Sequence, residues 1–72
     1  MNREKDKQKL MSASINQEIT VAWFAEGGGL VYRLWDVYVL FEVPLYGGKP
    51  NYVETFCESK IEDLLDMAYS WS

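Results

Sequence analysis

Residues 19–57 have the sequence ITVAWFAEGGGLVYRLWDVYVLFEVPLYGGKPNYVETFC, in which apolar segments alternate with turn signals. The segments are rich in β-branched and aromatic residues, which favour strands, and glycine, proline and aspartate mark the breaks between them. The segments are Ile19–Ala25, Leu30–Leu34, Val37–Pro44 and Tyr52–Cys57, separated at residues 27–29, 35–36 and 46–50. This pattern predicts an antiparallel β-meander of three to four strands.

A capped amphipathic stretch follows directly after the last apolar segment. Ser59 and Glu62 have the spacing of a capping box at the start of a helix. An apolar stripe then recurs at helical spacing, at Ile61, Leu64, Leu65, Ala68 and Trp71. The sequence therefore predicts a helix from about Lys60 to Trp71 that packs on one face of the sheet. The expected fold class is α+β, with the order ββββα.

Residues 10–26 fit two interpretations. As a helix they place an apolar stripe on one side, which gives the alternative order αβββα with an N-terminal helix over residues 11–26. As a strand, Ile19–Ala25 alternates and is rich in β-branched and aromatic residues, and this interpretation is favoured for 19–25. Residues 1–9 alternate charges without an apolar anchor, so we expect a flexible charged tail before a single domain at 10–72.

The turn at Trp35-Asp36 sets a register for the second and third strands. It pairs Tyr32 with Val39 and Leu30 with Phe41. The more apolar set of alternating residues is expected to face the core: Leu30, Tyr32, Leu34, Val37, Val39, Phe41 and Val43. The opposite set is Val31, Arg33, Tyr38, Leu40 and Glu42. For the fourth strand, the inward set is either Val53, Thr55 and Cys57 or Tyr52 and Phe56, and Glu54 favours the first.

Composition excludes several kinds of chemistry. The chain has 72 residues, one cysteine and no histidine, so it lacks an intrachain disulfide, a zinc site and histidine-based catalysis. We expect no enzyme activity, no cofactor and no metal. The net charge is −4 and the acids lie mainly in residues 10–72, so direct nucleic-acid binding is not expected. The lone Cys57 is expected to be a small buried apolar residue and not a reactive thiol.

The same features indicate where such a chain works. A single cysteine is typical of a reducing compartment, and the charged N-terminal segment lacks the apolar region of a secretory signal. No apolar run approaches the roughly 18 residues of a membrane span. We expect a cytoplasmic protein that does not enter a membrane.

Packing predicts a protein partner. One helix covers only one face of a four-stranded sheet, and the other face is too apolar to be left to solvent. Ile19–Ala25 also lacks the charge or proline that protects an edge strand. The sequence therefore predicts a non-enzymatic protein–protein interaction module, expected to be a homodimer, that binds through an aromatic sheet face or a sheet edge. The predicted partner-binding residues are Phe24, Arg33, Tyr38, Leu40, Tyr46 and Tyr52.

An alternative function uses the acids around the C-terminal helix. Their clustering is also explained by helix capping and an ordinary solvated face. If it is functional, it predicts a small inhibitor that imitates nucleic-acid phosphates against a basic partner. The residues of this acidic surface are Glu58, Glu62, Asp63 and Asp66.

Overall fold

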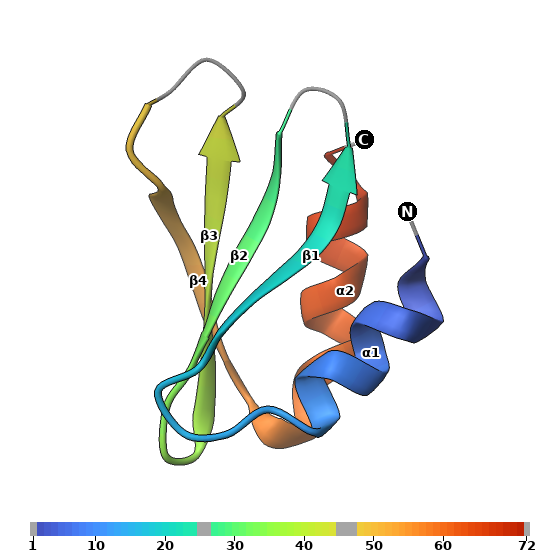
Figure 1. Cartoon of the computed structure of the whole chain (residues 1–72), viewed down its shortest axis with the longest axis vertical. Helices are drawn as coiled ribbons and strands as arrows, with labels where there is room; N and C mark the ends of the chain where they lie inside the picture. Colours follow the sequence, from blue (N-terminus) through green and yellow to red (C-terminus); the bar gives the residue numbers. More distant parts are fainter. Residues whose placement is uncertain (1, 25–26, 45–47, 72) are drawn as a thin grey trace.

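The computed structural model describes residues 2–24, 27–44 and 48–71 of the chain. Within them, four antiparallel strands form one sheet in the order β1-β2-β3-β4, preceded by helix α1 and followed by a short 3-10 turn η1 and helix α2 (Figure 1). The elements are α1 (Arg3–Met11), β1 (Glu18–Phe24), β2 (Gly27–Arg33), β3 (Val37–Pro44), β4 (Asn51–Cys57), η1 (Glu58–Lys60) and α2 (Ile61–Tyr69). The predicted α+β meander with a C-terminal helix is confirmed.

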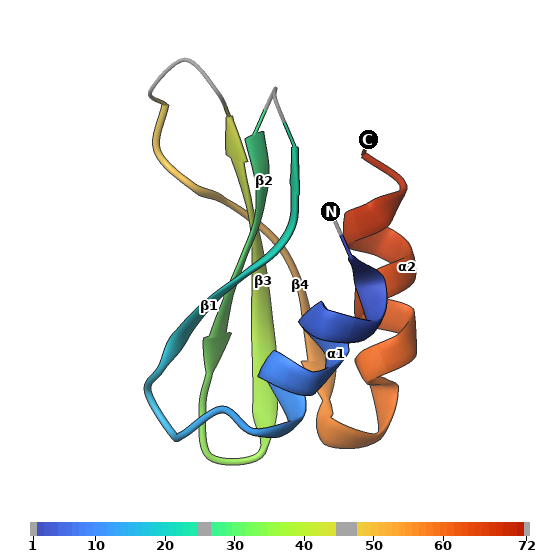
Figure 2. The ribbon, with the colours of Figure 1, turned by 45° about the vertical axis from the view of Figure 1, so that its right-hand side comes forward.

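Both helices lie on the same side of the sheet (Figure 2). Helix α2 turns back after β4 and the short η1 turn, and α1 packs against both β1 and α2. The sheet therefore has one face under the two helices, called here the covered face, and one face without a helix, called here the open face. The arrangement has two layers.

The hydrophobic core lies between the covered face and the helices. Every strand contributes buried side chains to it, and α2 contributes three from its apolar stripe. Its buried members are Leu10, Ile19, Val21, Ala22, Val31, Tyr38, Leu40, Phe56, Leu64, Leu65 and Ala68. These residues form one hydrophobic core, as expected of a single small domain.

The predicted register of the central hairpin is confirmed, but the predicted core face is wrong. Leu30 pairs with Phe41 and Tyr32 with Val39, as expected. The helices nevertheless cover the set that includes Val31 and Leu40, which are fully buried. Both alternating sets are apolar enough to form a core, so the number of apolar residues on each face does not decide which one the helices cover.

Strand β4 matches neither predicted inward set alone. A bulge interrupts its pairing with β3, between the Leu40–Glu54 and Phe41–Tyr52 pairs. Phe56 is buried and Val53 is half-buried against the core, whereas Cys57 is exposed. The bulge places residues of both predicted sets on the core side. The expectation that Cys57 is buried is wrong.

The three consecutive glycines begin β2 and do not form the turn that the sequence predicts there. A Cβ atom on Gly28 would lie 2.4 Å from Cε3 of Trp23, and one on Gly29 would lie 3.0 Å from Cγ2 of Val21. Glycine is therefore required for the close approach of β1 to β2. The connection itself, at residues 25–26, lies outside the described residues.

Helix α1 occupies the segment that the sequence assigns to a tail. Asn2 caps it, because its side chain accepts a hydrogen bond of 3.1 Å from the backbone N–H of Lys5. Leu10 is its only buried apolar residue, so it lacks the apolar stripe by which a helix is recognised in sequence. The alternative helix over 11–26 is wrong, since β1 covers Glu18–Phe24.

Helix α2 begins differently from the predicted capping box. Its N-cap position is Lys60, and no side-chain hydrogen bond caps its first turn. Ser59 lies within η1, where its hydroxyl is 3.3 Å from Sγ of Cys57. The helix itself is confirmed, and the predicted capping box is wrong.

Candidate interaction surface

The open face carries a contiguous group of apolar and aromatic side chains from all four strands. Strands β2 and β3 supply the centre, since the open-face residues Leu30 and Tyr32 pair with Phe41 and Val39. We define the open-face surface as Trp23, Leu30, Tyr32, Val37, Val39, Phe41 and Tyr52. None of these side chains is charged, and the two outer aromatic residues, Trp23 and Tyr52, are 51% and 61% exposed.

Aromatic packing organises this surface at both of its sides. The rings of Phe41 and Tyr52 meet edge to face, with their centroids 6.1 Å apart. The hydroxyl of Tyr52 is 3.0 Å from Oγ1 of Thr55 on the same strand. On the other side, the ring of Trp23 lies against Gly28, where no side chain separates it from the backbone. These contacts place each outer aromatic ring against a neighbouring residue of the sheet.

A bulge in β1 places Trp23 on the open face. The register between β1 and β2 shifts between Val21 and Phe24, and Ala22 has a left-handed backbone with φ of 52°. Such a conformation is strained for a residue other than glycine. Asp6 of α1 stabilises it, because its Oδ2 accepts a hydrogen bond of 2.8 Å from the backbone N–H of Ala22. Ala22 is thereby turned into the core and Trp23 to the opposite side.

A shallow groove of about 360 Å³ lies on the open-face surface. Side chains of β2 and β3 form its floor, and residues preceding β4 form its rim. The lining residues are Leu30, Tyr32, Phe41, Lys49 and Pro50. Residues 48–50 lie on the side of the sheet away from the helices (Figure 2). The groove thus combines an apolar floor with one cation at its rim.

The sheet edges offer less to a partner than the open face does. At β1, Nζ of Lys9 donates a 2.6 Å hydrogen bond to the carbonyl of Thr20, and Asp6 binds the N–H of Ala22. Helix α1 therefore occupies main-chain groups of the edge that the sequence predicts to be unprotected. At β4, the bulge and the charge of Glu54 both disfavour pairing with another strand.

Most of the predicted partner-binding residues lie elsewhere. Tyr38 and Leu40 are buried on the covered face, where the hydroxyl of Tyr38 donates a 2.8 Å hydrogen bond to the carbonyl of Leu10. Burial raises the pKa of Tyr38. Phe24 is half-buried at the end of β1, and Tyr46 lies outside the described residues.

Arg33 also belongs to the covered face. Its guanidinium lies 4.5 Å from the ring centroid of Tyr38 and forms a 3.2 Å ion pair with Glu58. Its Nη1 atom is buried without a hydrogen-bond partner among the described residues. Of the predicted partner-binding residues that the structure describes, Tyr52 alone lies on the open-face surface. Sequence reasoning missed Trp23, Leu30, Tyr32 and Phe41, although the correct hairpin register already grouped the last three.

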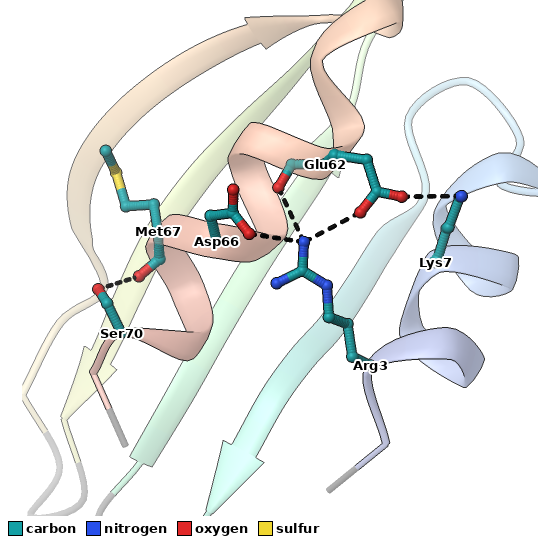
Figure 3. Close-up of polar contacts among 6 residues, drawn as sticks. All are labelled: Arg3, Lys7, Glu62, Asp66, Met67 and Ser70. Carbon is teal, nitrogen blue, oxygen red and sulfur yellow. Dashed lines mark hydrogen bonds and ion pairs between the residues drawn. The ribbon is translucent and has the colours of Figure 1, made fainter.

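Basic residues of the same chain pair with the acids of the predicted acidic surface. Glu62 binds Arg3 at 2.9 Å and Lys7 at 2.8 Å, and Asp66 binds Arg3 at 2.7 Å (Figure 3). The hydrogen bonds from Lys7 and from Arg3 lower the pKa of Glu62. Glu58 pairs with Arg33, and Asp63 lies 3.9 Å from Lys60. These pairs with α1, β2 and η1 leave little uncompensated negative charge for a basic partner.

Among the described residues, no three acidic or cysteine side chains are grouped closely enough to hold a metal ion. The helices of the described segments are too short and too polar to cross a bilayer. No family model matches the chain, and searches of curated proteins and of solved structures returned no significant match. The open-face surface is therefore the feature on which a functional argument rests.

Proposed function

We propose that this protein is a non-enzymatic protein–protein interaction module that forms a homodimer through its open-face surface. One observation carries the proposal: seven uncharged side chains, four of them aromatic, form a contiguous surface on the sheet face that no helix covers. Surfaces of this kind on small domains mark interaction sites, and tyrosine and tryptophan supply much of the interface energy.

The size of the face supports a partner of the same dimensions. Four strands of about seven residues span roughly 19 Å by 24 Å, or roughly 450 Å² in projection. Upright side chains increase the accessible area above this projection, which brings it toward the roughly 600 Å² per partner of the smaller specific interfaces. A second copy presents a face of equal size, and back-to-back packing of two sheets buries both faces at once.

Stability and charge favour the same arrangement. A domain of about 60 to 70 residues is only marginally stable when it folds alone, and association is the usual remedy where disulfides and metals are absent. The chain carries a net charge of −4, and the seven residues of the open-face surface are uncharged. Glu18, which pairs with Tyr32 at the β1 edge of the same face, borders this surface, so the apolar centres of two copies meet without like charges and their Glu18 carboxylates lie at the margin.

The test introduces a charge at the centre of the face. In Val39→Lys, each copy places a lysine in the apolar centre of a back-to-back dimer, so we expect the dimer dissociation constant to rise by more than about tenfold. Sedimentation velocity over a range of concentrations measures the association, and circular dichroism checks that the monomer remains folded. The matched control is Gln8→Lys, which adds the same charge at an exposed position of α1.

The expected result is a wild-type dimer at tens of micromolar, a Gln8→Lys dimer and a folded Val39→Lys monomer. A wild-type chain that stays monomeric at millimolar concentration contradicts the proposal. A Val39→Lys variant that dimerises as tightly as wild type moves the interface away from the open face and contradicts it equally.

A further inference from the structure

Trp35 is the most exposed of the large apolar residues described, at 77%. It lies in the turn between β2 and β3, which a 2.9 Å hydrogen bond from the N–H of Leu34 to the carbonyl of Val37 closes. A tight turn presents its side chains on a rigid support. An exposed tryptophan on such a turn is the kind of residue that anchors an interface.

The groove on the open face suits an indole ring. Its floor is apolar and aromatic, at Leu30, Tyr32 and Phe41, and Lys49 is the basic residue among those that line it. A cation beside an aromatic face contributes a favourable electrostatic interaction. A volume of about 360 Å³ is sufficient for one such ring.

Trp35 does not reach the groove of its own chain. Leu30 lies five positions before it, which corresponds to roughly 17 Å along an extended strand. The groove floor therefore lies near the middle of the hairpin, at the Leu30–Phe41 pair, and Trp35 lies at the turn that ends it. Because the turn and the groove are separated along the hairpin, the turn of each copy can insert into the groove of the other copy.

We propose that the homodimer is antiparallel, with Trp35 of each copy seated in the Leu30, Tyr32, Phe41, Lys49 and Pro50 groove of the other. This inference rests on the proposed function. A two-fold axis that crosses the strands near the Tyr32–Val39 pair brings each turn over the opposite groove. Each contact then occurs twice, and Tyr32 and Val39 lie close to their own symmetry mates.

This arrangement also increases the buried area. The indole and the rim residues Lys49 and Pro50 extend the interface beyond the strands themselves. The centre of the interface remains apolar, and the charged residues Lys49 and Glu18 lie at its periphery, Glu18 on the outer strand β1. The Trp35 anchors thus supplement the modest area of the sheet face.

Engineered disulfides test the arrangement directly. In a Cys57→Ser background, we combine Asp36→Cys with Pro50→Cys, which place one thiol beside Trp35 and another at the groove rim. Oxidation of this double variant is expected to give a covalent dimer, and peptide mass mapping is expected to join residues 36 and 50. The single variants Asp36→Cys and Pro50→Cys are the controls, because antiparallel packing holds each pair of identical positions at opposite ends of the interface.

Trp35→Ala supplies an independent measurement. We expect the dimer dissociation constant to rise about 10- to 100-fold, with a smaller rise for Trp35→Phe, which retains an aromatic ring. Because Trp35 is exposed, the stability of the monomer is expected to be unchanged. Sedimentation velocity and urea unfolding measure the two quantities separately.

The outcomes separate this inference from the proposed function. Dimerisation together with a 36–50 crosslink and weakened association of Trp35→Ala supports both. A wild-type dimer that Val39→Lys disrupts, with no 36–50 crosslink or with unchanged association of Trp35→Ala, overturns the antiparallel anchor and keeps the open-face dimer. Absence of any wild-type dimer overturns both.

Discussion

The two faces of the sheet have similar apolar content and different roles. Polar groups on the covered face find partners in the helices and the η1 turn: Tyr38 binds the carbonyl of Leu10, and Arg33 pairs with Glu58. On the open face, the hydroxyl of Tyr52 pairs within its own strand, with Thr55. In this chain the helices and η1 both cover one face and bind most of its polar groups, and among the described residues Nη1 of Arg33 is the buried exception.

Helix α1 is central to this difference, although it brings little apolar surface. Its Asp6 carboxylate joins three parts of the fold, since it binds the N–H of Ala22, the hydroxyl of Tyr69 at 2.5 Å and Nζ of Lys9 at 3.4 Å. Desolvation and the bond to Asp6 raise the pKa of Tyr69, which stays protonated and continues to donate. Polar contacts of Asp6 thus attach α1 to β1 and to α2 at the β1 side of the covered face.

The largest expected effect compares adjacent residues on opposite faces. Leu40 is fully buried under the helices, so Leu40→Ala leaves a cavity and is expected to destabilise the folded monomer by about 2–5 kcal/mol. Val39 is half-buried on the open face, and Val39→Ala is expected to cost the monomer less than about 1 kcal/mol. Urea unfolding at a concentration below the dimer dissociation constant measures both.

The same pair of variants has the opposite order of effects on association. Val39→Ala removes a contact at the centre of the proposed interface, whereas Leu40→Ala acts only through the stability of the fold. Equal losses of monomer stability for the two variants contradict the division into a covered and an open face. A larger loss of monomer stability for Val39→Ala than for Leu40→Ala means that the face with Val39 is the core face, as the sequence predicted.

Residue patterns were sufficient for the strands and the central hairpin but not for the choice of face. β3 covers Val37–Pro44 as predicted, and the pairing of Leu30 with Phe41 followed from the turn at Trp35-Asp36. The predicted site failed because both alternating sets are apolar, and the faces differ only in what packs on them. The position of a helix relative to a sheet depends on chain connections and tertiary contacts that a local pattern does not contain.

Helix α1 and the bulge in β1 also depend on contacts between residues that are distant in sequence, and each stabilises the other. The stabilising partners of α1, from Thr20 to Tyr69, lie 11 to 63 residues away along the chain. The left-handed Ala22 contradicts its local propensity and is compatible with the fold because Asp6 binds its N–H. Trp23 reaches the open face through this contact, so the sequence alone did not place it there.

A smaller effect is expected from removing the carboxylate that joins α1 to the sheet. Asp6→Ala leaves the N–H of Ala22 and the hydroxyl of Tyr69 without this acceptor, and we expect a loss of about 1–3 kcal/mol in the free energy of unfolding. Asp6→Asn retains one carbonyl oxygen as an acceptor and is expected to lose less. Thermal unfolding of both variants gives the order.

Asp6→Ala also sharpens the comparison of the faces, because it removes the contact that holds the β1 bulge. We expect the emission of Trp23 to shift as the bulge relaxes, which is best recorded in a Trp35→Phe, Trp71→Phe background. An Asp6→Ala variant as stable as wild type, with unchanged emission, means that the bulge forms without α1 and that the helix is dispensable.

The smallest effect concerns the exposed ion pairs between the two helices. Hydrogen bonds from Lys7 and Arg3 lower the pKa of Glu62 in the folded chain below its ordinary value of about 4.3. Its contribution to stability is therefore complete above that ordinary value and is lost as the pH falls through the lowered pKa. Because the pairs are exposed, the contribution is small and decreases with salt.

Thermal unfolding of wild type and Glu62→Gln between pH 3 and pH 7 measures this contribution. We expect the two melting temperatures to differ slightly at neutral pH in low salt and to converge as the pH falls or as salt is added. Glu54→Gln, which neutralises an exposed glutamate on β4 away from α1, is the matched control and is expected to show no such convergence. A melting temperature of Glu62→Gln equal to that of wild type under all conditions means that Glu62 adds nothing to the attachment of α1, which then depends on Asp6, Lys9, Leu10 and the Arg3–Asp66 pair.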